Sequence, residues 1–158
     1  MKKQKDTAYF LWILLAETVG VLSGWITRSS IVRHPAPAIV PPLSLPAPVF
    51  SLLWPLFLAL MGIGAARVWL APSGVSRSHG LAFFLLQLGL TLSWCLLFFG
   101  FQAFGLAFLW LLLLWSNLLG MIFSFRGADR AAALLQIPCF LWVTFAGYLN
   151  LMTWVLNW

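Results

Sequence analysis

Charged side chains are scarce in this sequence. They make up 8% of its 158 residues, whereas a soluble domain carries roughly 25%. So few charges cannot coat a surface that faces water, which excludes an ordinary soluble domain. Hydrophobic residues account for 63% of the chain. The composition therefore predicts an integral membrane protein with lipid as its main solvent.

Groups that carry chemistry are also few. The chain has three acidic residues, two histidines and two cysteines. His34 and His79 fall in different predicted loops on opposite sides of the membrane, and neither a catalytic triad nor a metal cluster nor a phosphate loop is visible. A haem iron could take His34 as a ligand, but a solvated loop histidine is the simpler interpretation. Cys95 and Cys139 lie in apolar segments and predict buried small residues. We nominate no catalytic residue and no metal ligand.

Long apolar runs predict the fold. A membrane-spanning helix needs about 20 mostly apolar residues, and the chain offers five such runs. We expect an all-α integral membrane protein, with a single domain over residues 1–158 and no internal repeat. The predicted spans of this five-transmembrane-helix bundle are 8–27, 49–70, 80–100, 104–125 and 131–157. The apolar run after Lys5 continues without a convincing cleavage site, so we interpret it as a retained first helix.

Between the first two spans lies a long proline-rich loop, predicted over residues 28–48. Its prolines are Pro35, Pro37, Pro41, Pro42, Pro46 and Pro48. Proline removes a backbone donor and disfavours helix at the residue before it. Long loops in compact proteins often serve as lids or binding loops.

The formal net charge of +6 is best explained by membrane topology. Lysine and arginine gather at the helix ends and form no basic face for nucleic acid, so no nucleic-acid partner is expected. Most of them lie on the side of the N-terminus, and only Arg28 and Arg33 lie on the other. Basic loops face the cytoplasm. We expect a cytoplasmic N-terminus, an outward-facing C-terminus and a bacterial inner membrane.

Several side chains repeat at helical spacing on one face of their span. They are Phe50, Trp54 and Phe57 in the second span, Gln87, Thr91, Trp94 and Phe98 in the third, and Pro138, Trp142, Ala146, Leu149 and Asn150 in the fifth. Polar groups on a membrane helix should face the bundle interior. Spacing alone leaves two interpretations open, namely aromatic filler between helices or a cavity for a flat apolar ligand.

The ten tryptophans divide into two groups of five. Trp12, Trp25, Trp69, Trp154 and Trp158 lie near helix ends, where indoles anchor at the membrane interface. The candidates for a role inside the bundle are Trp54, Trp94, Trp110, Trp115 and Trp142. A buried indole N–H requires a partner, so tryptophan is a costly residue for a purely structural core.

Glu17 is the one acidic residue inside a predicted span. It is either a site for proton-coupled transport or a structural carboxyl bonded to a neighbouring helix or loop. Gly20 and Gly24 form a GxxxG pair on the same helix, and Gly62 and Ala66 form a similar small pair on the second. Such pairs allow close helix contact, either within the bundle or between protomers.

These residues together resemble the TspO/MBR family of tryptophan-rich sensory and translocator proteins. The second helix resembles it through Val49-Phe50, Trp54 and Ala65-Ala66-Arg67-Val68. The third and fourth do so through Gln87, Trp94, Phe98-Phe99-Gly100 and Trp115, and the fifth through Pro138, Trp142, Ala146 and Leu149-Asn150. Each piece is weak alone, but their order and spacing together are fairly specific.

The resemblance implies a pocket beneath the first loop that binds porphyrins such as protoporphyrin IX or haem, or a similar flat apolar molecule, with no obligatory cofactor. Transport, sensing and light-dependent breakdown of porphyrin are all activities proposed for the family, and a homodimer is plausible. The implied ligand-binding residues are Phe50, Trp54, Trp94, Phe98, Trp142, Ala146 and Asn150, to which we add Thr91 as a polar group that orients the ligand.

The chain departs from the family pattern in places. The stretch Leu43–Pro48 has no tryptophan, Thr91 replaces an asparagine, Cys139 replaces a tyrosine, and no basic residue follows Tyr148 to complete a sterol-type pattern. Two further hypotheses stay open beside ligand binding: a proton-coupled transporter that uses Glu17, and a structural membrane subunit.

Overall fold

The structure is a computed structural model that describes residues 2–33, 39, 41–44 and 46–158. Its helices are α1 (Lys2–Arg33), α2 (Ala47–Leu70), α3 (Val75–Cys95), the π-helical η1 (Leu96–Gly100), α4 (Phe104–Ala128), α5 (Arg130–Leu134) and α6 (Ile137–Leu156). The described residues contain no strand. Five segments are long and apolar enough to span a membrane. The predicted five-helix membrane bundle is thus confirmed.

The first helix is longer than predicted. It was expected to end near Thr27, with a loop from residue 28, but α1 continues to Arg33. The hydroxyls in this region are satisfied within the helix: Thr27 Oγ1 donates to Ser23 O at 2.9 Å, and Ser29 Oγ donates to Trp25 O at 2.9 Å. Residues 34–38, 40 and 45 of the predicted proline-rich loop lie outside the described residues.

The boundary between the third and fourth spans lies where it was predicted. The wider π-helical turn of η1 closes α3, with the Phe101 N–H donating to Leu96 O at 2.9 Å. Gln102 then adopts a positive φ of 51°, and α4 begins at Phe104. The sequence did not predict the π-helical geometry. This π-helical turn ends the third span and contains Phe98 and Phe99.

The fifth span is interrupted, which the sequence analysis missed. It consists of α5 and α6, separated at Leu135 and Gln136. Pro138 explains the break, since its ring has no N–H to donate and would collide with the carbonyl four residues earlier. The buried Gln136 side chain bridges the break, and its Nε2 donates to Ala132 O at 3.1 Å and to Leu60 O of α2 at 3.5 Å.

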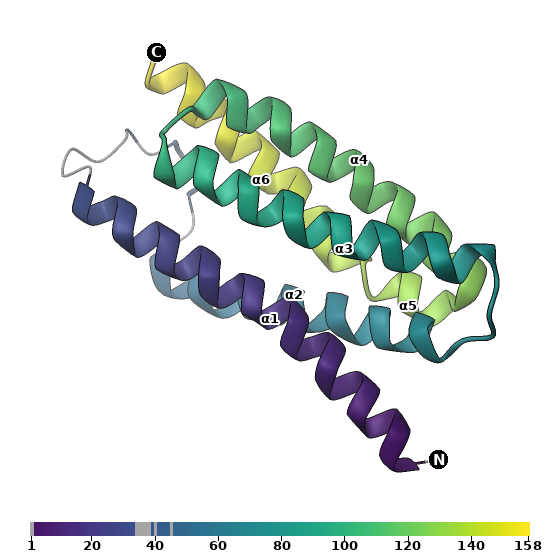
Figure 1. Cartoon of the computed structure of the whole chain (residues 1–158). Helices are drawn as coiled ribbons and strands as arrows, with labels where there is room; N and C mark the ends of the chain where they lie inside the picture. Colours follow the sequence, from purple (N-terminus) through teal and green to yellow (C-terminus); the bar gives the residue numbers. More distant parts are fainter. Residues whose placement is uncertain (1, 34–38, 40, 45) are drawn as a thin grey trace.

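The helices form one bundle in which α1 packs against α2, and α4 packs against α3 and α6 (Figure 1). The backbones of α1 and α2 come close at Gly62, where a Cβ atom would lie 2.6 Å from the Cα of Ile13. Glycine therefore permits the crossing. The small pair predicted on the second helix places Gly62 at a contact inside the chain.

The bundle is densely filled at the end where α1 begins. The largest fully buried side chains there include Phe84 of α3, Phe125 and Met121 of α4, and Val68 of α2. Close packing of such side chains leaves few voids. The cavities described below lie toward the opposite end, near the start of α2 and the end of α6. The interior of one half of the bundle is thus closely packed, although a separate hollow of about 270 Å³ lies at the edge of that end, among Lys5, Tyr9, Arg67, Leu70, Ala71, Pro72, Ala128 and Asp129.

A single ion pair closes the filled end, within the part of the chain that the structure describes. Arg67 of α2 holds Asp129 through two bonds, Nη2 to Oδ2 at 2.9 Å and Nε to Oδ1 at 3.3 Å. Asp129 also caps α5 by accepting from the Ala132 N–H at 2.9 Å. Burial raises the pKa of Asp129, but the bonds from Ala132 and Arg67 outweigh it, so that this pKa lies below its ordinary value.

Two substitutions at Asp129 should distinguish the contribution of the helix cap to stability from that of the ion pair. Asp129→Ala loses both and should destabilise the bundle by about 1–2 kcal/mol, whereas Asp129→Asn keeps a capping oxygen and should cost less. The pKa of Asp129 is lower in the folded state than its unfolded value of about 3.9. The Asp129 charge therefore stabilises the fold fully above that unfolded value. This stabilisation is lost as the pH falls through the folded pKa. Thermal unfolding in detergent at pH 7 and pH 3 should show the gap between wild type and Asp129→Asn shrinking at low pH. A gap that does not change with pH would contradict this role.

Candidate ligand-binding site

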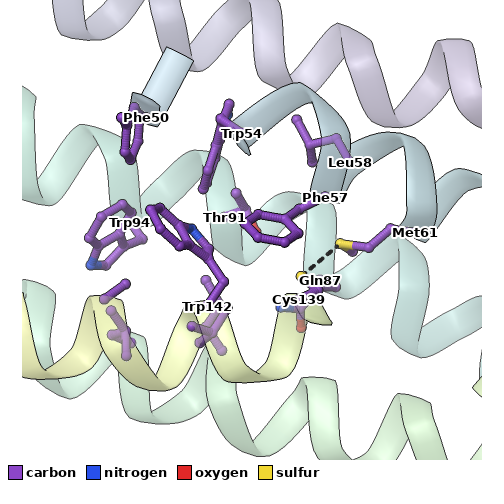
Figure 2. A pocket seen from close by; sticks show the side chains of 14 residues that line it. Phe50, Trp54, Phe57, Leu58, Met61, Gln87, Thr91, Trp94, Cys139 and Trp142 are labelled. Atoms are coloured by element: carbon purple, nitrogen blue, oxygen red, sulfur yellow. Dashed lines mark hydrogen bonds between the residues drawn. The ribbon is translucent and has the colours of Figure 1, made fainter. Parts of the chain in front are cut away.

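A cavity of about 50 Å³ lies inside the half of the bundle opposite the filled end. We call it the inner cavity. Its walls come from four helices and are formed by Phe50, Trp54, Phe57, Leu58, Met61, Gln87, Thr91, Trp94, Leu111, Leu114, Cys139, Trp142, Val143 and Ala146 (Figure 2). These walls are almost wholly apolar and aromatic. Such a lining with few polar groups is typical of small-molecule sites.

Aromatic rings occupy the centre of this region. The Trp142 ring of α6 lies below Phe50 and Trp54 of α2 in Figure 2. Its centroid is 5.8 Å from that of Phe50 and 5.3 Å from that of Phe57. Phe50 and Trp54 stack with centroids 5.6 Å apart and planes 15° apart. The rings thus form a surface on which a flat apolar molecule could stack.

Two polar side chains of α3 reach the inner cavity. The amide oxygen of Gln87 accepts from Asn117 Nδ2 of α4 at 2.7 Å, and the same nitrogen donates to Phe83 O at 3.0 Å. Thr91 is 6% exposed, and its hydroxyl has no hydrogen-bond partner among the residues that the structure describes. Gln136 Oε1 is the one fully buried side-chain polar atom without a partner among the described residues, so the unpaired Thr91 oxygen keeps some accessible surface. The Thr91 hydroxyl is therefore available to a bound molecule.

A larger hollow adjoins the inner cavity. We call it the α1–α2 groove. Its volume is about 600 Å³, and its lining consists of Gly20, Ser23, Gly24, Thr27 and Arg28 of α1, Ser44, Phe50, Ser51, Trp54 and Pro55 from the start of α2 and the chain before it, and Cys95, Phe99, Trp142 and Leu149. The α1 residues recur every three or four positions, so they form one face of that helix. Four of these five α1 residues have small side chains, which leaves space between the two helices.

Three aromatic residues separate the two hollows. Phe50, Trp54 and Trp142 line both the inner cavity and the α1–α2 groove. Trp54 is held in this wall by its indole N–H, which donates to Ser23 Oγ of α1 at 3.2 Å. Trp54 also stacks on Phe50, with ring centroids 5.6 Å apart. Trp54 is therefore fixed both to α1 and within the aromatic wall.

Most of the predicted site residues meet here. Six of them, Phe50, Trp54, Thr91, Trp94, Trp142 and Ala146, line the inner cavity.

The other two predicted residues, Phe98 and Asn150, lie behind Trp94. Phe98 stacks on the Trp94 ring with centroids 5.2 Å apart. Asn150 Oδ1 accepts from the Trp94 N–H at 3.0 Å, and its Nδ2 donates to Phe104 O at 2.9 Å. Both groups position Trp94 and do not line the cavity.

Several wall residues were absent from the predicted site. Leu111 and Leu114 come from α4, where nearly every residue is apolar. The sequence of α4 therefore does not distinguish its inner face from its lipid-facing side, and only the polar Asn117 indicates which face points inward. Met61 and Cys139 form a sulfur contact across the cavity wall, with Sγ and Sδ 3.6 Å apart (Figure 2). Cys139 takes the place where the family pattern has tyrosine, which could have identified it.

The remaining tryptophans are structural. Trp110 donates to Leu90 O at 3.2 Å, and Trp115 donates to Thr144 Oγ1 at 3.0 Å, so both join helices outside the cavity. Trp25, Trp69 and Trp158 are exposed, as expected for interface anchors.

Glu17 lies beside the groove, since a Cβ atom added to the groove residue Gly20 would be 3.6 Å from Glu17 Oε2. Glu17 lines neither the inner cavity nor the groove. His34 lies outside the described residues. The described residues contain no group of three or more potential metal ligands.

The sequence pattern of the TspO/MBR family matches residues 12–155, from α1 to the last turn of α6. The chain belongs to the TspO/MBR family. It is 36% identical to the protein CrtK of Rhodobacter capsulatus over 126 residues, which cover 77% of this chain and 74% of CrtK. The predicted family is therefore confirmed.

Other relatives extend over almost the whole length. The tryptophan-rich protein TspO of Chlorobaculum tepidum is 29% identical over 150 residues, covering 93% of this TspO/MBR chain and 94% of the relative. The translocator protein of Bos taurus is 30% identical over 143 residues, covering 89% and 85%. Both bacterial and animal proteins thus share this fold, and this chain is a multi-pass membrane protein of the same family.

Proposed function

We propose that this protein binds a flat apolar ligand of the porphyrin type inside the bundle, against the aromatic wall of Phe50, Trp54 and Trp142. The observation that carries the proposal is the Thr91 hydroxyl, which belongs to the lining of the inner cavity and has no hydrogen-bond partner among the described residues, while its oxygen remains accessible. A ligand that accepts or donates one hydrogen bond there would satisfy it.

Size supports a site that combines the two hollows. Sites for small organic ligands occupy roughly 300–1,000 Å³. The inner cavity offers about 50 Å³ and the adjoining groove about 600 Å³. A tetrapyrrole would therefore lie mainly in the groove and reach the inner cavity past the shared aromatic rings. Binding of this kind is the step that sensing, transport and light-dependent breakdown of porphyrin have in common.

The charge pattern supports the expected orientation. Lys3, Lys5, Arg67, Arg77 and Arg126 belong to the filled end of the bundle, and the start of α2 lies at the other. Because basic residues favour the cytoplasmic side, we propose that the filled end faces the cytoplasm of a bacterial cell. The hollow end would then open toward the outer side.

A porphyrin titration tests the function with a matched pair of tryptophan variants. Protein in lipid nanodiscs is titrated with protoporphyrin IX, and binding is followed by the shift of the porphyrin Soret band. Trp142→Leu removes a ring from the shared wall, and stacking on one aromatic side chain contributes about 0.5–1.5 kcal/mol beyond area burial. We expect saturable binding by wild type and affinity at least about fivefold weaker in Trp142→Leu.

Trp110→Leu is the control, because Trp110 lies outside both hollows and bonds to Leu90 O. It should bind as wild type does if it remains folded, which circular dichroism checks. Equal affinity of wild type and Trp142→Leu would place the ligand elsewhere.

A further inference from the structure

We propose that the α1–α2 groove binds the carboxylate end of an anionic tetrapyrrole, with Arg28 as the anchoring cation. This inference rests on the proposed function and makes it more specific. It assigns the charged end of the ligand to α1 and its ring to the aromatic wall. It thus predicts selectivity for acidic porphyrins over their neutral esters.

Arg28 is the charged group in the lining of the groove. It forms no ion pair with any described residue. The sequence contains only Asp6, Glu17 and Asp129 as acidic residues. Glu17 precedes Arg28 by about three turns of α1, roughly 16 Å, and the other two belong to the filled end of the bundle. No Asp or Glu side chain is therefore placed to neutralise Arg28.

Three of the groove hydroxyls already donate to backbone carbonyls. Ser23 Oγ donates to Val19 O at 2.8 Å, Thr27 Oγ1 donates to Ser23 O at 2.9 Å, and Ser44 Oγ donates to Pro41 O at 2.9 Å. These three protons are already committed to backbone carbonyls. Arginine, in contrast, offers a planar fork of donors that matches a carboxylate.

The arrangement along the groove fits a molecule with one apolar and one acidic side. Arg28 and Thr27 lie at the end of the α1 face, whereas Gly20, Ser23 and Gly24 lie deeper toward the bundle centre. Opposite them stand the rings of Phe50 and Trp54. A planar macrocycle with propionate groups on one edge fits both features, because its face can stack on the rings while its acidic edge reaches Arg28. An acyl chain has no comparable use for the stacked rings, which favours a tetrapyrrole over a phospholipid.

The test compares protoporphyrin IX with its dimethyl ester, which keeps the ring and removes the acidic charge. Titrations use nanodiscs of neutral phosphatidylcholine and wild type, Arg28→Gln and Arg126→Gln. Wild type should bind the acid about fivefold more tightly than the ester, as a partly exposed ion pair allows. Arg28→Gln should weaken the acid alone and bring this ratio near one. Arg126→Gln makes the same change of charge at the filled end and should keep the wild-type ratio.

The outcomes separate the anchor from the proposed function. If the preference for the acid survives in Arg28→Gln, or if that variant binds both ligands equally more weakly, the anchor is wrong while porphyrin binding stands. If wild type binds neither ligand, both proposals fail. Repeating the series with phosphatidylglycerol in the nanodiscs tests lipid phosphate as the occupant. If phosphatidylglycerol weakens protoporphyrin IX binding by wild type but not by Arg28→Gln, the lipid phosphate occupies Arg28 and the proposal is overturned. If phosphatidylglycerol changes the affinity of wild type and Arg28→Gln equally, the proposal is supported.

Discussion

Gly24→Leu should abolish porphyrin binding by a protein that remains folded. Gly24 lines the α1–α2 groove, and a Cβ atom added there would meet no heavy atom within 4 Å. A leucine side chain would therefore begin in open space beside the groove, without a collision at its Cβ. It would fill space that the ligand requires, and in a helix leucine is preferred to glycine by somewhat less than 1 kcal/mol. We expect affinity for protoporphyrin IX to fall at least about tenfold, with thermal stability unchanged or raised.

Gly89→Leu is the matched control. Gly89 lies on α3 and also has nothing within 4 Å of an added Cβ, but it lines neither the groove nor the inner cavity. The same change of residue should leave porphyrin affinity as in wild type. The comparison uses Soret titrations beside thermal unfolding of both variants. Wild-type affinity in Gly24→Leu would show that the ligand does not occupy the groove.

Gly62→Ala should destabilise the whole bundle, although it adds only one methyl group. That methyl would lie 2.6 Å from the Cα of Ile13 and 2.8 Å from the carbonyl oxygen of Trp12. These are backbone atoms of α1 and cannot rotate aside as a side chain can. The helices would have to separate at their crossing, and overpacking of this kind costs typically 1–3 kcal/mol, occasionally more. We expect a lowered unfolding temperature in detergent and less folded protein in the membrane.

Gly24→Ala provides the control for this second substitution. It makes the same chemical change on α1 where space is open, so it should be neutral or slightly stabilising through helix propensity. Thermal unfolding followed by circular dichroism compares the two variants with wild type. If Gly62→Ala unfolds at the wild-type temperature, the close crossing of α1 and α2 is wrong.

Composition and apolar run length were enough to predict the number of spans. These properties are local, because each span must satisfy its own backbone hydrogen bonds in lipid. Helix ends were harder to place. Hydropathy falls at Arg28 and Ser29, but α1 continues to Arg33, because a helix does not have to end where its residues become polar. The break before α6 was also missed, although Pro138 is a signal for it.

The candidate site was found in part for a related reason. Polar or aromatic residues at helical spacing identified the inner faces of α2, α3 and α6, so Trp54, Thr91 and Trp142 were predicted. In α4 the inner and outer faces are equally apolar, so Leu111 and Leu114 carried no signal. Spacing also cannot show depth, and Asn150 lies on the expected face but behind Trp94.

Two of the departures from the family pattern lie at the inner cavity. Thr91 and Cys139, which replace an asparagine and a tyrosine of that pattern, both line it. Each substitution removes a larger polar group from the wall. We therefore expect the ligand preference of this protein to differ from that of its relatives in the part of the ligand that reaches Thr91.

The measurement that tests the central claim most directly is the stoichiometry of protoporphyrin IX binding to wild type in neutral nanodiscs, with empty nanodiscs as the reference. A combined groove and cavity predicts a saturable Soret shift that ends at one porphyrin per chain. A signal that rises linearly with porphyrin, and equally in empty nanodiscs, would mean partition into lipid and would contradict a ligand site inside the bundle.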